Sequence, residues 1–428
     1  MSERRRPVKR HKNTGTKTYS ETVLGGYYDK YVGGLFGKFD NVRVYWEDQI
    51  TKYTLRPYLK RYLAAVQDRR KVRILDLGCG SGQGYEQLSK IGKRDVSLAL
   101  KDSFILPAER ISLYFGVDIS EEMLEKGREN YADKREVVFR KMDLRNGLDE
   151  RVVGKRPYDI YFSSYAALSH LDYGQARKLV SDIAKHSAPH ALLVLDFLGR
   201  YSIEWPRYWD AKSEDQKMRE YSMSYLYTNG ALSEEEPEKF TLRFWTGDEI
   251  AGLCEEVRKE SGISVRPLEV FDRSVFVGRH VDTREYNKWV KPLRKRVNRL
   301  HEDYMRTNLQ SLIIDRVPET SIEQLRRFYE KGIFSWNTVI KFTGMRLKGR
   351  IYPTEMKGWS KFSPALQQAI LNMDRVVDSV LWMSIGDPRA NIIEPQLSYS
   401  LRNMLNNMQC GMGCGHGLVA ILQVRKRK

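Results

Sequence analysis

The chain has 428 residues, of which 41% are hydrophobic and 30% charged, and its formal net charge is +18. This length has room for one large domain and an appendage. The longest apolar run, residues 191–198, contains Asp196 and is far too short to span a bilayer. The N-terminal residues carry charge without an apolar core, which argues against a secretory signal. Four cysteines argue against a disulfide framework, so we expect a cytoplasmic protein without a membrane span.

More than half of the net positive charge lies at the two ends of the chain. Residues 1–17 hold seven basic residues against Glu3, and residues 425–428 are all basic. We expect residues 1–18 to form a basic disordered tail, and RNA stays open as a partner of such tails. A third basic run, residues 288–299, lies inside the chain and is typical of the solvated face of a helix.

Residues 72–88 read VRILDLGCGSGQGYEQL, an apolar strand followed by a glycine turn and a helix that begins near Gln83. Glycines allow the backbone to turn through positive φ and to approach a ligand closely. The spacing does not fit the dinucleotide pattern G-x-G-x-x-G, because the third position falls on Gln83 or Tyr85. The turn therefore predicts a nucleotide-sized ligand other than NAD.

Four more apolar runs follow, each ending in a polar residue. ISLYFGVDIS ends near Asp118, VVFRKMDL at Asp143, YDIYFSS at Ser163 and Ser164, and ALLVLDFLG near Asp196. Such runs are typical of buried parallel strands. The carboxyl ends of parallel strands meet at one edge of a sheet, so we expect these polar residues to lie together there.

The run DLGCGSG, with these strand ends in this order, resembles the first motif of the class I S-adenosylmethionine-dependent methyltransferases. The resemblance implies an α/β fold, a seven-stranded Rossmann-like methyltransferase sheet with an N-terminal helical segment and a C-terminal helical extension, and S-adenosylmethionine as cofactor. It implies that Asp118 accepts hydrogen bonds from the ribose and Asp143 from the adenine amino group. The cofactor-binding residues that it implies are Asp76, Gly78, Cys79, Gly80, Asp118, Ile119, Asp143, Leu144 and Ser163. One departure is a longer gap before Asp118, which we interpret as an inserted segment.

On the basis of this resemblance, we divide the chain into four parts. We expect a tail at 1–18, an N-terminal helical lid segment at 19–70, a cofactor-binding core at 71–283 and a mainly helical extension at 284–428. Within the first helical segment, Tyr27, Tyr28 and Tyr31 either close over the cofactor or pack on a helix. Within the core, residues 199–240 are rich in aromatic residues and predict a cap over the acceptor, whose rings either stack on it or form the cap's own interior. These aromatic residues are Trp205, Tyr208, Trp209, Tyr221, Tyr225 and Tyr227.

Local signals predict several elements after residue 240. Thr246 and Glu249 form a capping box at a helix start. ISVRPLEVF and SVFVGRHV, bounded by Asp272 and Arg273, predict two strands, which the resemblance implies to be the closing hairpin of the sheet. Ser321 and Ser363 are expected to begin helices in the extension. Residues 418–424 predict a final strand.

No catalytic residue is assigned from the sequence. His170 and Tyr165 follow the fourth strand and are candidates for a general base, but His170 lies beside Leu168 and Leu171 and is more typical of a packed residue. Cys410, Cys414 and His416 offer three metal ligands with a spacing that is not typical of zinc sites, so no metal is predicted.

The absence of one known motif narrows the range of possible methyl acceptors. The fourth motif reads SSYA rather than the D/N-P-P-Y pattern of enzymes that methylate amino groups of nucleic acids. We therefore expect transfer to an oxygen or nitrogen of a small or medium-sized acceptor. The alternatives are an RNA methyltransferase, cap-guanine-like or other, since guanine cap enzymes also combine a YYDK-like entrance with S-x-x-A-x-x-H, or a non-catalytic scaffold that binds the cofactor. The oligomeric state is not predicted.

Overall fold

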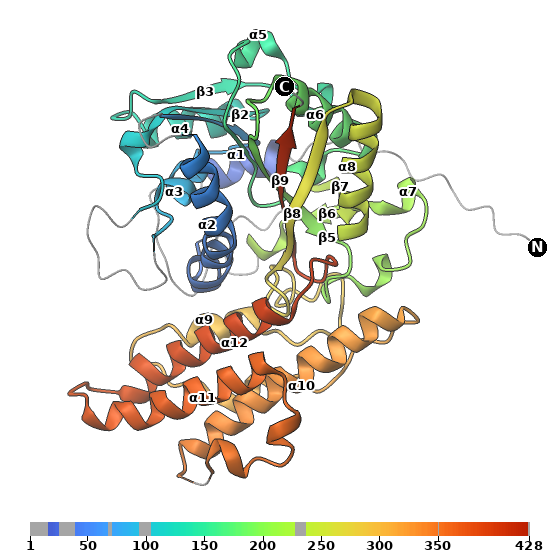
Figure 1. The fold of residues 1–428 in the computed structure, drawn as a ribbon. Helices are drawn as coiled ribbons and strands as arrows, with labels where there is room; N and C mark the ends of the chain where they lie inside the picture. The colour runs from blue at the N-terminus through green and yellow to red at the C-terminus, as the bar shows by residue number, and fades with distance from the viewer. Residues whose placement is uncertain are drawn as a thin grey trace, which may run out of the picture.

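The structure, a computed structural model, describes residues 16–24, 39–66, 71–93, 104–226, 237–349 and 351–426. Figure 1 shows an α/β domain built on a central sheet and, below it, a group of packed helices. The expected lid tyrosines at 27, 28 and 31, Tyr227 of the cap, most of the N-terminal tail and part of the insertion before Asp118 lie outside the described residues.

Seven strands form the main sheet, in the order β3-β2-β1-β4-β5-β9-β8. Strands β1 to β5 run parallel, whereas β9 runs antiparallel to both of its neighbours, β5 and β8. This arrangement confirms the expected seven-stranded Rossmann-like sheet. The bounds of the strands are Val72–Leu77 for β1, Ile111–Asp118 for β2, Val137–Lys141 for β3, Ile160–Phe162 for β4, Leu192–Gly199 for β5, Ser264–Arg273 for β8 and Gly417–Arg425 for β9.

A hairpin extends the sheet at the carboxyl end of β5. It consists of β6 (Met218–Ser222) and β7 (Lys239–Trp245), which pair antiparallel. The end of β7 runs parallel to the end of β5, where Leu198 is paired with Phe244. This pairing places the hairpin next to the edge of the sheet where the polar strand ends meet. With the hairpin included, the described sheet has nine strands.

Side chains of the inner strands alternate between two layers of helices. In β5, Leu192 and Val194 pack into the cluster on one face, whereas Leu193 and Leu195 pack into the cluster on the other. Both faces are buried, which explains why these strands are continuous apolar runs in the sequence. The cluster that contains Leu192 is covered by α2 (Asp48–Ala65), α3 (Gln83–Ser89) and α4 (Glu121–Asn130), and the other by α6 (Tyr173–His186) and α8 (Gly247–Ser261) (Figure 1).

Side-chain caps begin several of these helices. The Thr246 side chain accepts from the Glu249 amide and the Glu249 side chain accepts from the Thr246 amide, so the expected capping box at α8 is confirmed. The α3 helix begins at Gln83, also as expected. The shorter helices are α1 at Thr16–Leu24, α5 at Glu150–Val153 and α7 at Glu214–Lys217. Since α1 begins at Thr16, the expected disordered tail does not extend through residue 18.

The closing hairpin of the sheet differs from the sequence expectation. Residues 274–281, expected to be the partner strand of β8, form no strand. The partner is β9, which pairs with β8 along its length and lies between β8 and β5. This inner position requires apolar side chains on both faces; β9 is buried throughout its first six residues, whereas residues 274–281 include Arg279 and His280. The expected core boundary at 283 is therefore wrong, because the helical part is inserted between the last two strands of the sheet.

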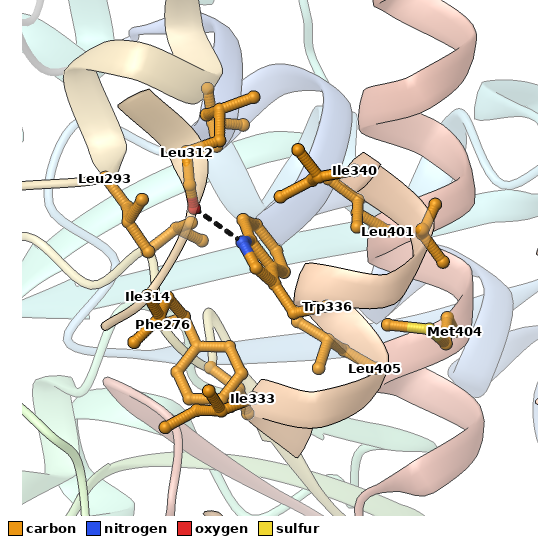
Figure 2. Packing of buried hydrophobic residues seen from close by; sticks show 14 of the residues in the cluster. Phe276, Leu293, Leu312, Ile314, Ile333, Trp336, Ile340, Leu401, Met404 and Leu405 are labelled. Atoms are coloured by element: carbon orange, nitrogen blue, oxygen red, sulfur yellow. Dashed lines mark hydrogen bonds between the residues drawn. The ribbon is translucent and has the colours of Figure 1, made fainter. Parts of the chain in front are cut away.

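The inserted part contains four main helices around one apolar core. Figure 2 shows the fully buried Trp336 at its centre, with its indole Nε1 donating to the carbonyl of Leu312 over 2.9 Å. Ser363 caps α11 as expected, whereas α10 begins at Glu323 after Ile322, so the expected cap at Ser321 is wrong. No described helix has the length and apolar character needed to cross a bilayer. The helices are α9 at Arg294–Arg299, α10 at Glu323–Arg346, α11 at Pro364–Ser379 and α12 at Glu394–Met408.

Residues of the N-terminal segment contact the inserted helices through apolar packing, hydrogen bonds and ion pairs. Trp46 joins the core of the helical part, and its Nε1 donates to the Ser398 hydroxyl over 2.7 Å. Arg294 is buried and forms ion pairs with Asp40 at 2.6 Å and Glu47 at 2.7 Å. The basic run 288–299 is therefore not a single solvated face, because its central arginine belongs to the interior.

Candidate active site

A cavity of about 950 Å³ lies at the carboxyl edge of the sheet. It is lined by residues that follow β1, β2, β3 and β4, by the β6–β7 hairpin, and by segments far away in the sequence. Seven of the nine cofactor residues implied by the resemblance line it, whereas Asp76 and Ser163 do not. The seven are Gly78, Cys79, Gly80, Asp118, Ile119, Asp143 and Leu144.

The glycine turn after β1 brings bare backbone to the cavity. Gly78 and Gly80 have φ of 70° and 51°, conformations that favour glycine. A Cβ at Gly78 would lie 2.6 Å from the Cβ of Ala167. The amides of Gly78 and Cys79 donate to the carbonyl of Val117 at 2.8 and 3.0 Å. These two amides therefore join the turn to β2 and are not available to a ligand. The glycines are needed because they let the backbone pack closely against neighbouring atoms.

Asp118 is fixed at the end of β2 by two backbone amides. One carboxylate oxygen accepts from Gly80 N at 2.8 Å, and the other accepts from Ser120 N at 3.0 Å. A carboxylate offers about four acceptor positions. The two amides therefore orient the side chain of Asp118 at the cavity wall.

Asp143 is held by Arg145 at the end of β3. Arg145 Nη2 lies 2.6 Å from Asp143 Oδ2, and the Arg145 amide donates to Oδ1 over 3.0 Å. The hydrogen bonds from the Arg145 side chain lower the pKa of Asp143. The carboxylate is therefore ionised at neutral pH and acts as an acceptor beside the cavity.

Asp76 and Ser163 lie behind the cavity wall. Asp76 is fully buried and accepts a hydrogen bond from the Tyr114 hydroxyl, and burial raises its pKa to about 7. Ser163 is also buried, and the next residue, Ser164, lines the cavity in its place. Neighbouring residues of extended backbone point in opposite directions, so only one of the two serines expected at this strand end, Ser164, lines the cavity.

The aromatic residues of the expected cap divide between two environments. Tyr221 and Tyr225 line the cavity, together with Met223. Trp205 and Trp209 are buried, and neither they nor Tyr208 line the cavity. Both alternatives of the sequence analysis therefore apply, each to different residues. Tyr19 of α1 also lines the cavity, so the N-terminal segment contributes to its wall.

The two candidate bases after β4 both line the cavity but are already engaged. His170 Nε2 lies 3.1 Å from the Tyr19 hydroxyl, and burial, followed by the charge of Arg145, lowers the pKa of His170 to about 4. The Tyr165 hydroxyl donates to Asp48, and its ring lies 3.7 Å from the Arg43 guanidinium carbon. These contacts favour a fixed wall over a proton acceptor.

Several cavity residues were missed by the sequence analysis. Arg43, Glu47, Arg273 and Arg279 come from two segments far apart in the sequence and converge on the cavity. Glu47 is buried, yet the opposing charges of Arg294 and Arg279 hold its pKa well below the usual value although burial alone would raise it. No local motif marks these residues, because only the folded chain brings them together.

The glycine-rich segment before β9 holds the three residues considered as metal ligands. Cys414 is buried, Cys410 is exposed, and His416 lines the cavity. Among the residues that the structure describes, no cluster of three or more His, Cys, Asp or Glu residues has the arrangement of a metal site. His416 therefore lines the cavity, whereas Cys410 and Cys414 do not.

Residues 74–190 match a family model described as a methyltransferase domain. The chain contains a class I S-adenosylmethionine-dependent methyltransferase domain. The match extends from β1 to the end of α6 and includes all the implied cofactor residues. The protein is therefore an enzyme that uses S-adenosylmethionine as methyl donor. No curated protein matches the sequence.

Solved structures of other methyltransferases are similar to a little more than half of this chain. An amino pentose methyltransferase from Micromonospora echinaspora with S-adenosylmethionine bound is 17% identical, with 52% of this chain and 86% of that chain covered and a TM-score of 0.31. The CcbJ methyltransferase from Streptomyces caelestis is 15% identical, with 59% and 89% covered and a TM-score of 0.35. Magnesium protoporphyrin IX methyltransferase from Synechocystis PCC 6803 with SAH bound is 16% identical, with 58% and 88% covered and a TM-score of 0.32.

Proposed function

We propose that this methyltransferase transfers the methyl group to an oxygen or nitrogen atom of a small or medium-sized acceptor. The observation that carries the proposal is the single cavity of about 950 Å³, which reaches from the glycine turn after β1 to the aromatic side chains of the β6–β7 cap. Ligand pockets usually measure ~300–1,000 Å³. The cavity is at the upper end of this range and has room for a cofactor with a compact acceptor.

The strand ends of β1 to β3 supply the cofactor end of the cavity. We assign Asp118 to the ribose hydroxyls, because two amides orient its carboxylate at the cavity wall. We assign Asp143 to the adenine amino group, because its lowered pKa keeps it an ionised acceptor at the cavity. Ile119 and Leu144 offer apolar contacts beside them. Asp76 supports this site from behind through Tyr114 and makes no contact with the cavity.

When bound, S-adenosylmethionine supplies a methyl group on a positively charged sulfur. The chain's task in such a displacement is to align the acceptor and exclude water. Tyr221, Met223 and Leu242 of the cap close the cavity opposite the strand ends. Tyr165 forms part of the wall, and its ring contacts the guanidinium groups of Arg43 at 3.7 Å and Arg273 at 4.8 Å.

We also propose a cytoplasmic location. All four cysteines are free, and three of them, Cys79, Cys254 and Cys414, are buried. Free cysteines are typical of reducing compartments.

The proposal is tested with the full chain and methyl-tritiated S-adenosylmethionine. Calorimetry first measures cofactor binding, and Gly80→Val is the negative control because a branched side chain would enter the cofactor's space. Transfer is then measured to a panel of phenols, sugar alcohols, hydroxy acids and amines, and separately to total RNA. We expect cofactor binding and transfer to at least one small acceptor.

Three results contradict the proposal. Transfer to RNA alone, with binding that weakens steeply as salt rises, would identify an RNA methyltransferase. Cofactor binding with no transfer to any acceptor would identify a scaffold. No cofactor binding by folded protein would exclude the assigned site altogether.

A further inference from the structure

His416 is held at the carboxyl edge of the sheet by the strand that follows it. Its carbonyl accepts from Gly199 N over 3.1 Å, and the next residue, Gly417, is paired with Leu198 of β5. The imidazole lines the same cavity as Asp118 and Ser164. It therefore faces the space in which the proposed function places cofactor and acceptor.

A buried carboxylate orients this imidazole. His416 Nδ1 lies 2.9 Å from Oε2 of Glu204, whose side chain is 0% exposed. The Glu204 carboxylate also accepts from the Ser202 hydroxyl at 2.9 Å and from the His280 amide at 2.5 Å. Burial alone would raise the pKa of Glu204, but His416 and His280 lower it. An ionised carboxylate only accepts hydrogen bonds, so the neutral imidazole carries its proton on Nδ1 and its lone pair on Nε2.

The lone pair on Nε2 has no competing partner among the described residues. The structure shows hydrogen bonds of His416 through Nδ1 and through its backbone carbonyl. The Nε2 edge is therefore the part of the ring that remains for a molecule in the cavity. An imidazole with a carboxylate on one nitrogen and an open second nitrogen has the arrangement of a general base.

The other two histidines near the cavity lack this arrangement. His170 has Nε2 on the Tyr19 hydroxyl and no carboxylate partner, and its pKa is lowered to about 4 by burial and by Arg145. His280 is buried behind the wall, does not line the cavity, and has its pKa lowered to about 3, chiefly by burial. Among the histidines that the structure describes, only His416 combines a place at the cavity with an ionised carboxylate partner.

We propose that His416, oriented by Glu204, is the general base that accepts the proton of the methyl acceptor. The proposal rests on the proposed function. The acceptor's lone pair forms the bond to the methyl carbon as the carbon–sulfur bond breaks, and the pair of that bond stays on the sulfur. The acceptor's proton moves to His416 Nε2, and the resulting imidazolium keeps its Nδ1–H on the Glu204 carboxylate before releasing a proton to water.

Charged groups of both signs lie near His416. Glu204 contacts it directly, and Asp196 on β5 interacts with it electrostatically. Asp196 is itself paired with Arg273 at 2.8 Å, and the neutral His280 ring lies 6.1 Å away. The guanidinium-bearing residues Arg273 and Arg279 line the same cavity as His416.

The loop between the inserted helices and β9, which precedes His416, is held in place by contacts on two sides. Asp272, at the end of β8, accepts from Gly413 N at 2.9 Å and Gly415 N at 3.1 Å. The hydroxyl of Tyr329 on α10 donates to the carbonyl of Tyr201 at 2.5 Å and lies 3.5 Å from the carbonyl of Cys414. The insertion therefore ends in a loop that is braced from both the sheet and the helical core, which fixes His416 at the cavity.

The test compares His416→Gln and Glu204→Gln with His190→Gln, which removes an exposed histidine away from the cavity. The acceptor is the one identified in the panel described above. We expect His416→Gln to lower kcat by ~10²–10⁴-fold, with the Kd for S-adenosylmethionine changed less than threefold. Glu204→Gln should lower kcat and move the acid limb of the pH profile to lower pH, a shift that a purely structural role would not cause. His190→Gln should match the wild type.

A second readout needs no acceptor. Diethyl pyrocarbonate acylates unprotonated, accessible histidine nitrogens, and peptide mass spectrometry should find His416 modified faster than His170 and His280. The pH midpoint of its modification should fall in Glu204→Gln. The proposal is overturned if His416→Gln keeps kcat within threefold of wild type, or if His416 is modified no faster than the two buried histidines. If the wild type methylates nothing in the panel, the proposed function fails while this readout still decides on the oriented imidazole.

Discussion

The carboxylate of Asp118 accepts a hydrogen bond from the backbone amide of Gly80 over 2.8 Å. The residue that we assign to the ribose therefore also ties the glycine turn to the end of β2. We predict that Asp118→Ala weakens S-adenosylmethionine binding by ~1.5–3 kcal/mol, because hydrogen bonds to a charged group are lost. Calorimetry at constant salt measures this change.

The control for Asp118→Ala is Asp149→Ala. Asp149 also accepts from the amide two residues later, at 2.9 Å, but it lies outside the cavity. This variant should bind the cofactor like the wild type. Equal dissociation constants for Asp118→Ala and Asp149→Ala would show that Asp118 does not contact the ribose.

Gly84 is required because the helix α3 packs directly over Asp76. A Cβ at this position would lie 2.2 Å from Asp76 Oδ2 and 3.0 Å from the Phe162 ring. We predict that Gly84→Ala lowers the free energy of unfolding by ~1–3 kcal/mol through overpacking. Gly344→Ala, in α10 with no atom within 4 Å of the added Cβ, should raise it by ~0.5–1 kcal/mol through helix propensity. Urea unfolding followed by tryptophan fluorescence measures both, and a stabilised Gly84→Ala would contradict the packing.

Local patterns predicted most of the α/β domain. The apolar runs of β1, β4, β5 and β9 are recognisable because these inner strands are largely buried on both faces. The caps at Thr246 and Ser363 depend only on neighbouring residues. Seven of the nine implied cofactor residues lie at the cavity for the same reason, since they follow directly from these strand ends.

Long-range pairings were not predictable in this way. The choice of β9 rather than residues 274–281 as the partner of β8 depends on contacts between segments more than 140 residues apart, and no local signal encodes it. Glu204 and His416 meet for the same reason, since they are separated by 212 residues. The sequence also could not decide which of Ser163 and Ser164 lines the cavity, because neighbouring residues of extended backbone point in opposite directions.

Asp76 gives the stability of the domain a specific pH dependence. Burial raises the pKa of Asp76 to about 7 in the folded state, against ~3.9 in the unfolded chain. The folded state therefore binds a proton that the unfolded state has lost, so this contribution to stability falls as pH rises between about 4 and 7. In Asp76→Asn the group no longer titrates, and we predict that the variant gains stability relative to wild type by ~1.4 kcal/mol per pH unit at most from pH 5 to 7.

Urea unfolding at pH 5, 6 and 7 tests the Asp76 prediction. The Tyr114 hydroxyl keeps an acceptor in Asp76→Asn, so the packing beneath the turn is retained. Because Asp76 does not line the cavity, the variant should bind S-adenosylmethionine within threefold of wild type. Parallel pH profiles for variant and wild type would show that the carboxyl is ionised in the folded protein, contrary to the prediction.

Arg294 supplies the positive charge at the junction between the N-terminal segment and the inserted helices. It is buried, pairs with Asp40 and Glu47, and donates to the carbonyl of Val277 over 2.8 Å. Arg294→Met leaves two buried carboxylates with one fewer partner, and we predict a loss of ~3–5 kcal/mol in the free energy of unfolding at pH 7. Arg299→Met, an exposed position on the same helix, should change it by less than ~0.5 kcal/mol.

The pH dependence of Arg294→Met follows from its two partners. Arg294 and Arg279 lower the pKa of Glu47 and Asp40 against the opposing effect of burial. A carboxyl whose pKa is lowered on folding contributes stability above its unfolded pKa of ~4, and this contribution is lost as pH falls through the folded value. Without Arg294, the two carboxyls take up protons at higher pH than in wild type and so lose their unpaired charge. The stability gap between wild type and Arg294→Met should therefore narrow as pH falls from 7 toward 4, whereas a gap that stays constant would show that the loss comes from packing of the arginine stem alone.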